Sequence, residues 1–262
     1  MTMTIAEIRM RALLLASLFA IIILLFVVPL SSDSAPGYTT SAKPLRVLFI
    51  GNSLTYSNDL PAIVAALAKA SGQRRLDYKT LAFPDFSLED HWTRKDALKA
   101  IVKGNWDYVV LQQGPSASSE GRALLLEYSR RFAQEIRKIG ARPALYMVWP
   151  SRSRMQDFEG VSISYRKAAE DVDGMCFPVG EAWLGAWRTD PAIKLYSGDG
   201  FHPSATGSYL AALVIYAQLY QRSPVGLPSN LRFGSGKIEL SKDEAVVLQR
   251  AAEEANKRFG RR

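Results

Sequence analysis

The strongest constraint on the fold is a regular alternation of short apolar segments with longer amphipathic ones, which begins at Leu45. The first apolar segment, residues 45–50, contains Val, Phe and Ile and is closed by Gly51, as in a buried strand of a parallel sheet. Strands that alternate with helices in this way form right-handed βαβ units. The sequence therefore predicts an α/β fold, a three-layer α/β/α sandwich with a mostly parallel sheet.

The alternation predicts the following elements. Strands are expected at residues 45–50, 77–82, 108–112, 144–149 and 175–179, and helices at residues 62–71, 88–103, 119–139, 161–171, 203–220 and 241–259. The last helix begins with a capping box of Ser241 and Glu244, and we expect it to pack against the core rather than to act chemically. No internal repeat interrupts the pattern, so residues 44–262 are expected to form one domain.

The N-terminal region contains an uncharged apolar run over residues 12–30. Nineteen helical residues at ~1.5 Å each span about 28 Å, close to the ~30 Å core of a bilayer. Arg9 and Arg11 precede the run, which favours a cytoplasmic N-terminus and an extracytoplasmic domain. Residues 1–30 are therefore expected to be a membrane anchor or a signal peptide, and residues 31–43 a flexible linker. The run is longer than a usual signal-peptide core, which favours an uncleaved anchor; cleavage would make the protein secreted.

Composition excludes several classes of site. Cys176 is the only cysteine, so no intrachain disulfide can form. His91 and His202 are the only histidines, and no Cys/His cluster has the spacing of metal ligands, so neither a metal nor another cofactor is expected. His91 is expected to be a helix-surface or packing residue. The net charge of +8 is scattered along the chain without a nucleic-acid-binding motif, so no nucleic-acid partner is expected.

Two loops contain residue types that are common in catalytic sites. In an open parallel sheet, ligands bind at the carboxyl ends of the strands, and Ser53 follows the first strand in the sequence Gly51-Asn52-Ser53. Near the C-terminus, Asp199 and His202 are separated by two residues, which allows the carboxylate to bind imidazole Nδ1 and to turn Nε2 toward a nucleophile. Taken singly, each is better explained as a turn or helix-cap residue.

Together, Gly51-Asn52-Ser53 after the first strand and Asp199-x-x-His202-Pro203 near the end resemble the first and last motifs of the SGNH (GDSL-like) hydrolases. The resemblance extends from Leu45 to about Leu227. It implies the flavodoxin-like SGNH hydrolase fold. It also implies a catalytic triad of Ser53, His202 and Asp199, with Ser53 as the nucleophile.

The two middle motifs of the family are less well kept. Asp85 stands where the family has a glycine whose backbone N–H binds the oxyanion, and the N–H of Asp85 can still serve. In the third motif Ser116 replaces the usual asparagine. The Gln113-Gly114 pair instead resembles carbohydrate acetylesterase branches of the family, in which a glutamine is the side-chain donor. The resemblance thus implies an oxyanion hole of Ser53, Asp85 and Gln113, with Gln112 as the alternative to Gln113; both glutamines can equally be loop hydrogen-bonding residues.

The resemblance implies a serine esterase that cleaves carboxylic esters through an acyl-enzyme. The extracytoplasmic location and the glutamine-type third motif favour short-chain or acetyl esters on a carbohydrate or cell-envelope polysaccharide, and short-chain lipid or thioester substrates stay open. Two alternatives use the same fold. One is an O-acyltransferase with the same triad, and the other is a binding domain without catalytic activity.

Overall fold

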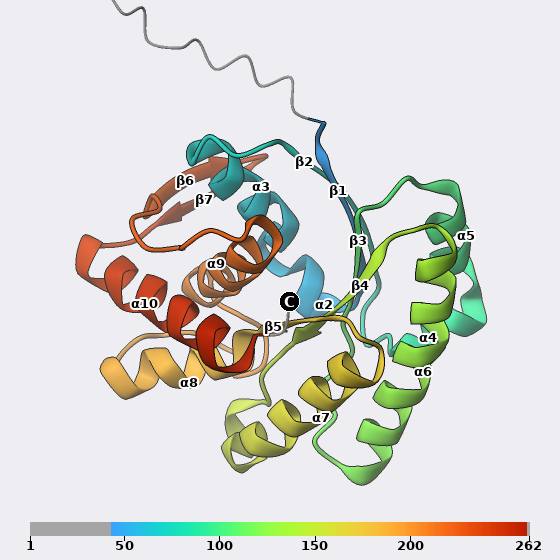
Figure 1. Cartoon of the computed structure of the whole chain (residues 1–262). Helices are drawn as coiled ribbons and strands as arrows, with labels where there is room; N and C mark the ends of the chain where they lie inside the picture. Colours follow the sequence, from blue (N-terminus) through green and yellow to red (C-terminus); the bar gives the residue numbers. More distant parts are fainter. Residues whose placement is uncertain (1–42, 261–262) are drawn as a thin grey trace, which may run out of the picture. The chain divides into compact units, whose positions relative to one another are not determined.

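The computed structural model describes residues 43–260 (Figure 1). The apolar run over residues 12–30 lies outside the described residues, as does the linker up to residue 42. None of the helices within residues 43–260 has the length and apolar character that a bilayer span requires. The division of the chain into anchor, linker and domain therefore stays a prediction.

A five-stranded parallel sheet forms the middle layer of the domain. Its strands are β1 (Leu45–Gly51), β2 (Leu76–Ala82), β3 (Tyr108–Leu111), β4 (Arg142–Met147) and β5 (Met175–Pro178). The strand order is β2-β1-β3-β4-β5, and all neighbouring strands pair in parallel. This is the order of flavodoxin-like folds, so the predicted α/β architecture is confirmed.

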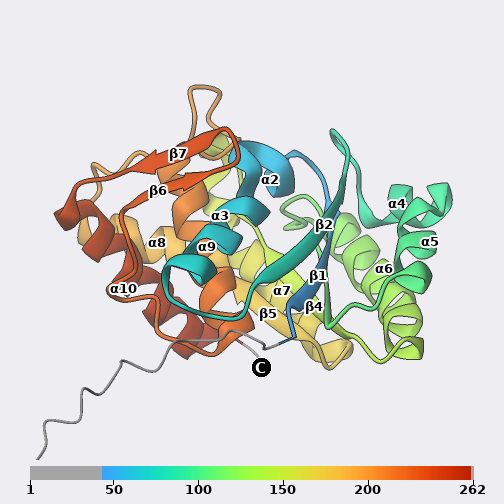
Figure 2. The ribbon, with the colours of Figure 1, turned by 90° about the horizontal axis from the view of Figure 1, so that it is seen from above.

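Helices cover both faces of the sheet (Figures 1 and 2): α3, α8, α9 and α10 lie on one side, and α4, α5, α6 and α7 on the other. The helices are α2 (Ser53–Tyr56), α3 (Leu60–Ala70), α4 (Leu88–Arg94), α5 (Asp96–Lys103), α6 (Ser119–Lys138), α7 (Phe158–Asp171), α8 (Val179–Thr189), α9 (Ala205–Tyr220) and α10 (Lys242–Phe259), with short 3-10 helices η1 (Ser57–Asp59) and η2 (Arg152–Asp157). A hairpin of β6 (Asn230–Phe233) and β7 (Gly236–Glu239) packs beside α3.

Three features differ from the sequence-based expectation. The helix expected over residues 88–103 is divided at Lys95, whose φ of 65° is left-handed and ends α4 before α5 begins. Helix α8 follows β5 directly, without the polar turn that usually marks such a boundary, so it was not expected. The hairpin of β6 and β7 was not expected either.

Helix α9 anchors the loop that precedes it. Nearly all of its residues from Gly207 to Leu219 are buried, as expected for a helix that is apolar on every side. It packs against α3, α8, α10 and β5. The loop that carries Asp199 and His202 ends at this helix and is thereby anchored to the centre of the domain.

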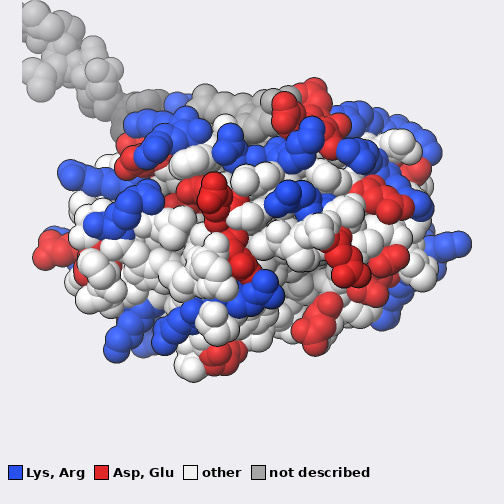
Figure 3. All heavy atoms as spheres, turned by 90° about the horizontal axis from the view of Figure 1, so that it is seen from below, with Lys and Arg blue, Asp and Glu red and all other residues white. Residues whose placement is uncertain are grey.

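Charged residues are distributed over the surface. On the face shown in Figure 3, Lys and Arg side chains are interspersed with Asp and Glu. The positive net charge is therefore not gathered in one region of this face.

Candidate active site

The turn that carries Ser53 lies at the carboxyl end of β1, next to the middle of the sheet. Asn52 caps the short helix α2, because its side-chain Oδ1 accepts a hydrogen bond from Leu54 N–H at 3.1 Å. The Asn52 side-chain amide donates to the carbonyl of Phe86 at 3.1 Å. Ser53 is the first residue of α2 and is 7% exposed. The turn is thus fixed on both sides of the serine.

Glycine is required at position 51 because its neighbours leave no room for a side chain. A Cβ atom at this position would lie 2.3 Å from both Gln112 Oε1 and Thr55 Oγ1, well inside contact distance. Its φ is not among the positive ones, so the conformational freedom of glycine is not the reason for its presence. The carbonyl of Gly51 accepts a hydrogen bond from His91 Nε2 at 2.8 Å. His91 is buried, and burial lowers its pKa, so it acts as a neutral packing residue beneath the serine turn.

Gln112 is the centre of a buried hydrogen-bond network that the sequence reasoning missed. Its Oε1 accepts from Asn52 N–H at 2.8 Å and from the Thr55 hydroxyl at 2.7 Å. Its Nε2 donates to the carbonyl of Gln113 at 2.6 Å. The side chain is fully buried; its Oε1 holds the serine turn and its Nε2 holds the loop after β3. Gln112 is therefore a positioning residue.

Asp199 and His202 form the hydrogen bond that their spacing predicts. His202 Nδ1–H donates to Asp199 Oδ2 at 2.5 Å. The other carboxylate oxygen accepts from the backbone N–H groups of Phe201 and His202, both at 2.9 Å, and from the Ser197 hydroxyl at 2.7 Å. The Phe201 N–H first, and the His202 imidazole second, hold the pKa of Asp199 well below its usual range. Asp199 is thus a carboxylate near neutral pH, and the ring atom Nε2 points away from it.

The loop of Asp199 and His202 is tied to the segment that follows Ser53. Asn58, in η1, donates from its side-chain amide to the carbonyl of Pro203 at 3.0 Å and to the Ser208 hydroxyl at 2.9 Å. Its φ of 54° is left-handed, which asparagine tolerates better than most residues. On the other side, Trp149 Nε1 donates to the carbonyl of Phe201 at 3.0 Å. Neither contact was predicted from the sequence.

A cavity of about 550 Å³ opens beside Ser53, and we call it the serine cavity. Ser53, Asp85 and Gln113 all line it, so the structure brings the three residues expected in an oxyanion hole to one place. Phe201, the neighbour of His202, lines it as well. Asp85 has a φ of 61°, which explains why the family favours glycine at this position.

The donors expected in the oxyanion hole differ in how they are used. Within residues 43–260, the backbone N–H groups of Ser53 and Asp85 donate to no protein acceptor. The side chain of Gln113, in contrast, is engaged: Nε2 donates to Ser116 Oγ at 3.0 Å and to the carbonyl of Gly121 at 3.3 Å, and Oε1 accepts from Leu88 N–H at 3.2 Å. The two backbone groups thus have no protein partner within residues 43–260, whereas the Gln113 amide is held by loop contacts.

The Cys176 thiol and possible metal ligands are the remaining groups to consider at the site. Cys176 is buried in β5, and burial raises the pKa of its thiol to about 12, so it stays protonated near neutral pH. In the part of the chain that the structure describes, no group of three or more His, Cys, Asp or Glu residues is arranged to hold a metal ion.

Sequence comparisons identify no relative: no protein-family model and no curated protein matches the chain. Solved structures do match. A DUF4886 family protein from Bacteroides uniformis superimposes with a TM-score of 0.70 over 82% of this chain and 96% of that one, at 20% identity. A candidate SGNH hydrolase from Slackia heliotrinireducens gives 0.57 over 66% of this chain and 98% of that one, at 28% identity.

An acetyl xylan esterase matches with a TM-score of 0.55 over 66% of this chain and 98% of that one, at 16% identity. At such identity a match shows the fold and no more. The fold of the chain is therefore that of the SGNH/GDSL-like hydrolases, and the predicted resemblance of the chain to that family is confirmed.

Proposed function

We propose that this chain, with its SGNH-like hydrolase fold, is a serine esterase that hydrolyses short acyl esters, with acetyl groups on a carbohydrate as its substrate class. The observation that carries the proposal is the Asp199–His202 hydrogen bond of 2.5 Å. It lies on a loop that Asn58 joins to the segment bearing Ser53. The three side-chain types that acyl transfer requires therefore lie on two segments that a hydrogen bond joins, which supports the proposal.

The proposed mechanism has two steps. His202 Nε2 removes the Ser53 hydroxyl proton as Oγ attacks the ester carbonyl, and the imidazolium then protonates the departing alcohol, which leaves an acyl-Ser53 intermediate. A water molecule, deprotonated by the same Nε2, attacks the acyl carbon and releases the carboxylic acid and free Ser53. Asp199 keeps the imidazole in the required tautomer and stabilises its charged form, which the lowered pKa of the carboxylate permits.

The proposed oxyanion hole consists first of the backbone N–H groups of Ser53 and Asp85. Both line the serine cavity and carry no protein acceptor among the described residues. Gln113 is the third proposed donor. Since its Nε2 bonds to Ser116 and Gly121 in the present arrangement, its contribution needs a small rearrangement of the loop when the charge develops.

The substrate class is inferred from the neighbours and from the serine cavity. Two structural neighbours are named as esterases of acetylated xylan or xylo-oligosaccharide. Ten of the 17 residues that line the serine cavity have polar or charged side chains, among them Arg154, which is paired with Asp157 at 2.6 Å. A short acyl group on a hydroxyl-rich carrier suits such a lining better than a long alkyl chain does.

Solvent access favours hydrolysis over acyl transfer. The His202 and Asp199 side chains are 38% and 50% exposed, so water reaches the base directly. An O-acyltransferase must keep water from the acyl-enzyme until its acceptor arrives. The acyltransferase alternative uses the same residues. It would be revealed if an added sugar acceptor became acetylated while the release of free acetate fell.

Location is a separate proposal. We propose that residues 12–30 anchor the protein in a membrane with the catalytic domain outside the cytoplasm, on the strength of the uncharged run and the preceding arginines. The full-length protein is then expected in the membrane fraction after alkaline extraction. A mature N-terminus found between residues 31 and 43 by mass spectrometry would replace the anchor with a cleaved signal peptide.

The experiment that tests the activity is acetate release from acetylated xylo-oligosaccharides. Ser53→Ala and His202→Ala are each expected to reduce the rate at least a thousandfold, and their combination little further, because triad members act as a unit. Ser57→Ala is the matched control, since Ser57 lies four residues along the chain and makes no side-chain hydrogen bond within residues 43–260. Wild-type rates in either Ser53→Ala or His202→Ala would refute the proposal.

A further inference from the structure

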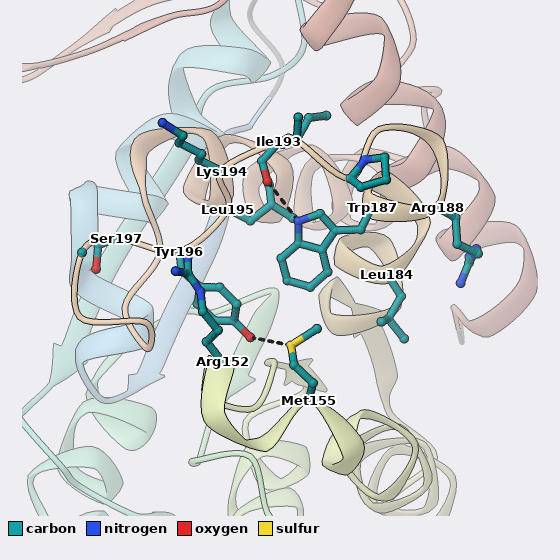
Figure 4. Close-up of a pocket in the computed structure, with 13 residues that line it drawn as sticks. Arg152, Met155, Leu184, Trp187, Arg188, Ile193, Lys194, Leu195, Tyr196 and Ser197 are labelled. Carbon is teal, nitrogen blue, oxygen red and sulfur yellow. Dashed lines mark hydrogen bonds between the residues drawn. The ribbon is translucent and has the colours of Figure 1, made fainter.

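A second cavity, larger than the serine cavity, lies beside η2 and helix α8. Its volume is about 820 Å³, and it is lined by Arg152, Met155, Leu184, Trp187, Arg188 and residues 191–198 (Figure 4). Neither Ser53 nor His202 lines it. The proposed reaction makes no use of this second cavity.

Aromatic rings form one wall of the second cavity. Figure 4 shows the indole of Trp187 between the side chains of Tyr196, Met155 and Leu184. Trp187 and Tyr196 have ring centroids 5.6 Å apart with a tilt of 32°. Trp187 Nε1 donates to the carbonyl of Ile193 at 3.0 Å, and the Tyr196 hydroxyl donates to the carbonyl of Pro150 at 2.6 Å. The protein itself satisfies these polar atoms, so the wall offers a ligand fixed aromatic surface.

The charges around the second cavity all have one sign. Arg152, Arg188 and Lys194 line it and are exposed, and no Asp or Glu is among its lining residues. Within residues 43–260 none of the three cations takes part in an ion pair, whereas exposed cations such as Arg131 and Lys257 do. The Arg152 guanidinium lies 5.3 Å from the Tyr196 ring centroid. The second cavity therefore combines an aromatic wall with unpaired positive charge.

The two cavities share a boundary. From η2, Arg152 and Met155 face the second cavity, whereas Arg154 and Asp157 line the serine cavity. The loop before α9 is shared in the same way: residues 197–198 line the second cavity, and Phe201 lines the serine cavity. The Arg152 N–H bonds to the carbonyl of Gly200 at 2.8 Å and joins the two segments into one ridge. A chain-like substrate that reaches Ser53 can cross this ridge.

We propose that the second cavity binds a carboxylate-bearing sugar unit of the same polysaccharide whose ester is cleaved at Ser53, and this proposal rests on the proposed function. The C–H face of a sugar ring packs on the indole of Trp187. Figure 4 shows Lys194 and Arg188 on opposite sides of this indole, so each pairs with the carboxylate of a different sugar unit along the chain. An acyl chain would cover the aromatic wall but leave the cations without a counter-charge. The substrate is accordingly an acidic polysaccharide, one that contains uronic acid units.

The test measures binding independently of catalysis. Trigalacturonate, which carries no ester, is titrated into the protein by calorimetry, and neutral xylotriose is titrated in parallel. Arg188→Gln/Lys194→Gln is expected to weaken trigalacturonate binding about tenfold, since each partly solvated charge pair contributes modestly. Lys69→Gln/Arg74→Gln is the matched control: it removes two exposed positive charges outside the second cavity and is expected to change the affinity by less than about twofold.

Any other binding result overturns the proposal. No binding of trigalacturonate, equal binding of xylotriose, or equal weakening in the control variant would each remove the acidic-sugar site. Binding of vesicles rich in anionic phospholipid, lost in Arg188→Gln/Lys194→Gln while trigalacturonate has no effect, would assign the cations to a membrane surface instead. If trigalacturonate binds as expected but no acetyl ester is hydrolysed, the proposed activity fails while the binding site stands.

Discussion

Replacing Gln112 by methionine tests the network beneath Ser53. Methionine has a similar volume and an unbranched side chain, so the substitution removes hydrogen bonds without leaving a large cavity. It takes away the acceptor of Asn52 N–H at 2.8 Å and of the Thr55 hydroxyl at 2.7 Å. It also removes the donor to the carbonyl of Gln113, which the Tyr165 hydroxyl still serves.

The expected magnitude follows from the two stranded donors. A buried donor without a partner costs about 1–3 kcal/mol, and the Thr55 hydroxyl can rotate to recover part of this. Gln112→Met is therefore expected to lower the free energy of unfolding by about 2–4 kcal/mol, which corresponds to a Tm lower by roughly 4–16 °C for a domain of this size. Because Asn52 directly precedes Ser53, kcat should fall about tenfold or more while KM changes little.

The control removes both partners of one bond. Thr55→Val alone is expected to cost about 1 kcal/mol, and in Thr55→Val/Gln112→Met the hydroxyl is no longer stranded, so the double variant should be about 1 kcal/mol more stable than the sum of the single effects. Urea unfolding followed by tryptophan fluorescence measures all three. A cost below 1 kcal/mol for Gln112→Met, or simple additivity with Thr55→Val, would refute the network as described.

Three further predictions concern the groups around the site. Asn58→Gly is expected to lower kcat about tenfold with KM retained, because glycine keeps the left-handed backbone but loses the bond to Pro203; an unchanged kcat would show that this link does not position the loop. The lowered pKa of Asp199 makes its stabilising effect complete above the unfolded-state pKa of about 3.9 and lost as the pH falls through the native value. Measured from pH 5 downward, the Tm difference between wild type and Asp199→Asn should hold to about pH 4 and shrink below it, and a decline already at pH 5 would contradict the lowered pKa. Gln113→Ala should reduce kcat roughly a hundredfold if its amide turns to the oxyanion, whereas a lower Tm with kcat retained would leave it as a loop residue only.

The sheet and the position of Ser53 followed from rules that act along the chain. Parallel strands joined by helices have few possible arrangements, and the first strand of such a sheet ends near its middle. The sequence therefore predicted all five strands of the central sheet and the location of Ser53 at the end of β1. The hydrogen bond between Asp199 and His202 was equally accessible, because the two residues lie only three positions apart.

The network of Gln112 could not be read from local sequence. Gln112 lies 60 residues from Asn52, and the two meet because β1 pairs with β3 in a register that places Ile50 opposite Leu111. Register between distant strands has no signal in a single sequence. A usable sign did exist: a glutamine directly after a strand that pairs with the first one is well placed to bond the serine turn.

The second cavity was missed for a related reason. It depends on α8, whose start at Val179 has no polar turn before it because the chain enters the helix straight from β5. Gly180, in the first turn of this helix, lies against the carbonyl of Val148. A Cβ at Gly180 would be 2.5 Å from that oxygen. Without α8, Trp187 and Arg188 have no place in a predicted fold, and their proximity to Tyr196 cannot be inferred.

The most direct test of the proposed chemistry is covalent labelling of the protein by a fluorophosphonate, followed by intact-mass measurement and peptide mapping. The reagent reacts with a serine whose hydroxyl is activated by a neighbouring base, whatever the natural ester is. We predict a single adduct on Ser53 at close to one per chain, and labelling at least a hundredfold slower in His202→Ala. An unlabelled protein, or an adduct on another serine with Ser53 unmodified, would contradict the assignment of Ser53 as the nucleophile.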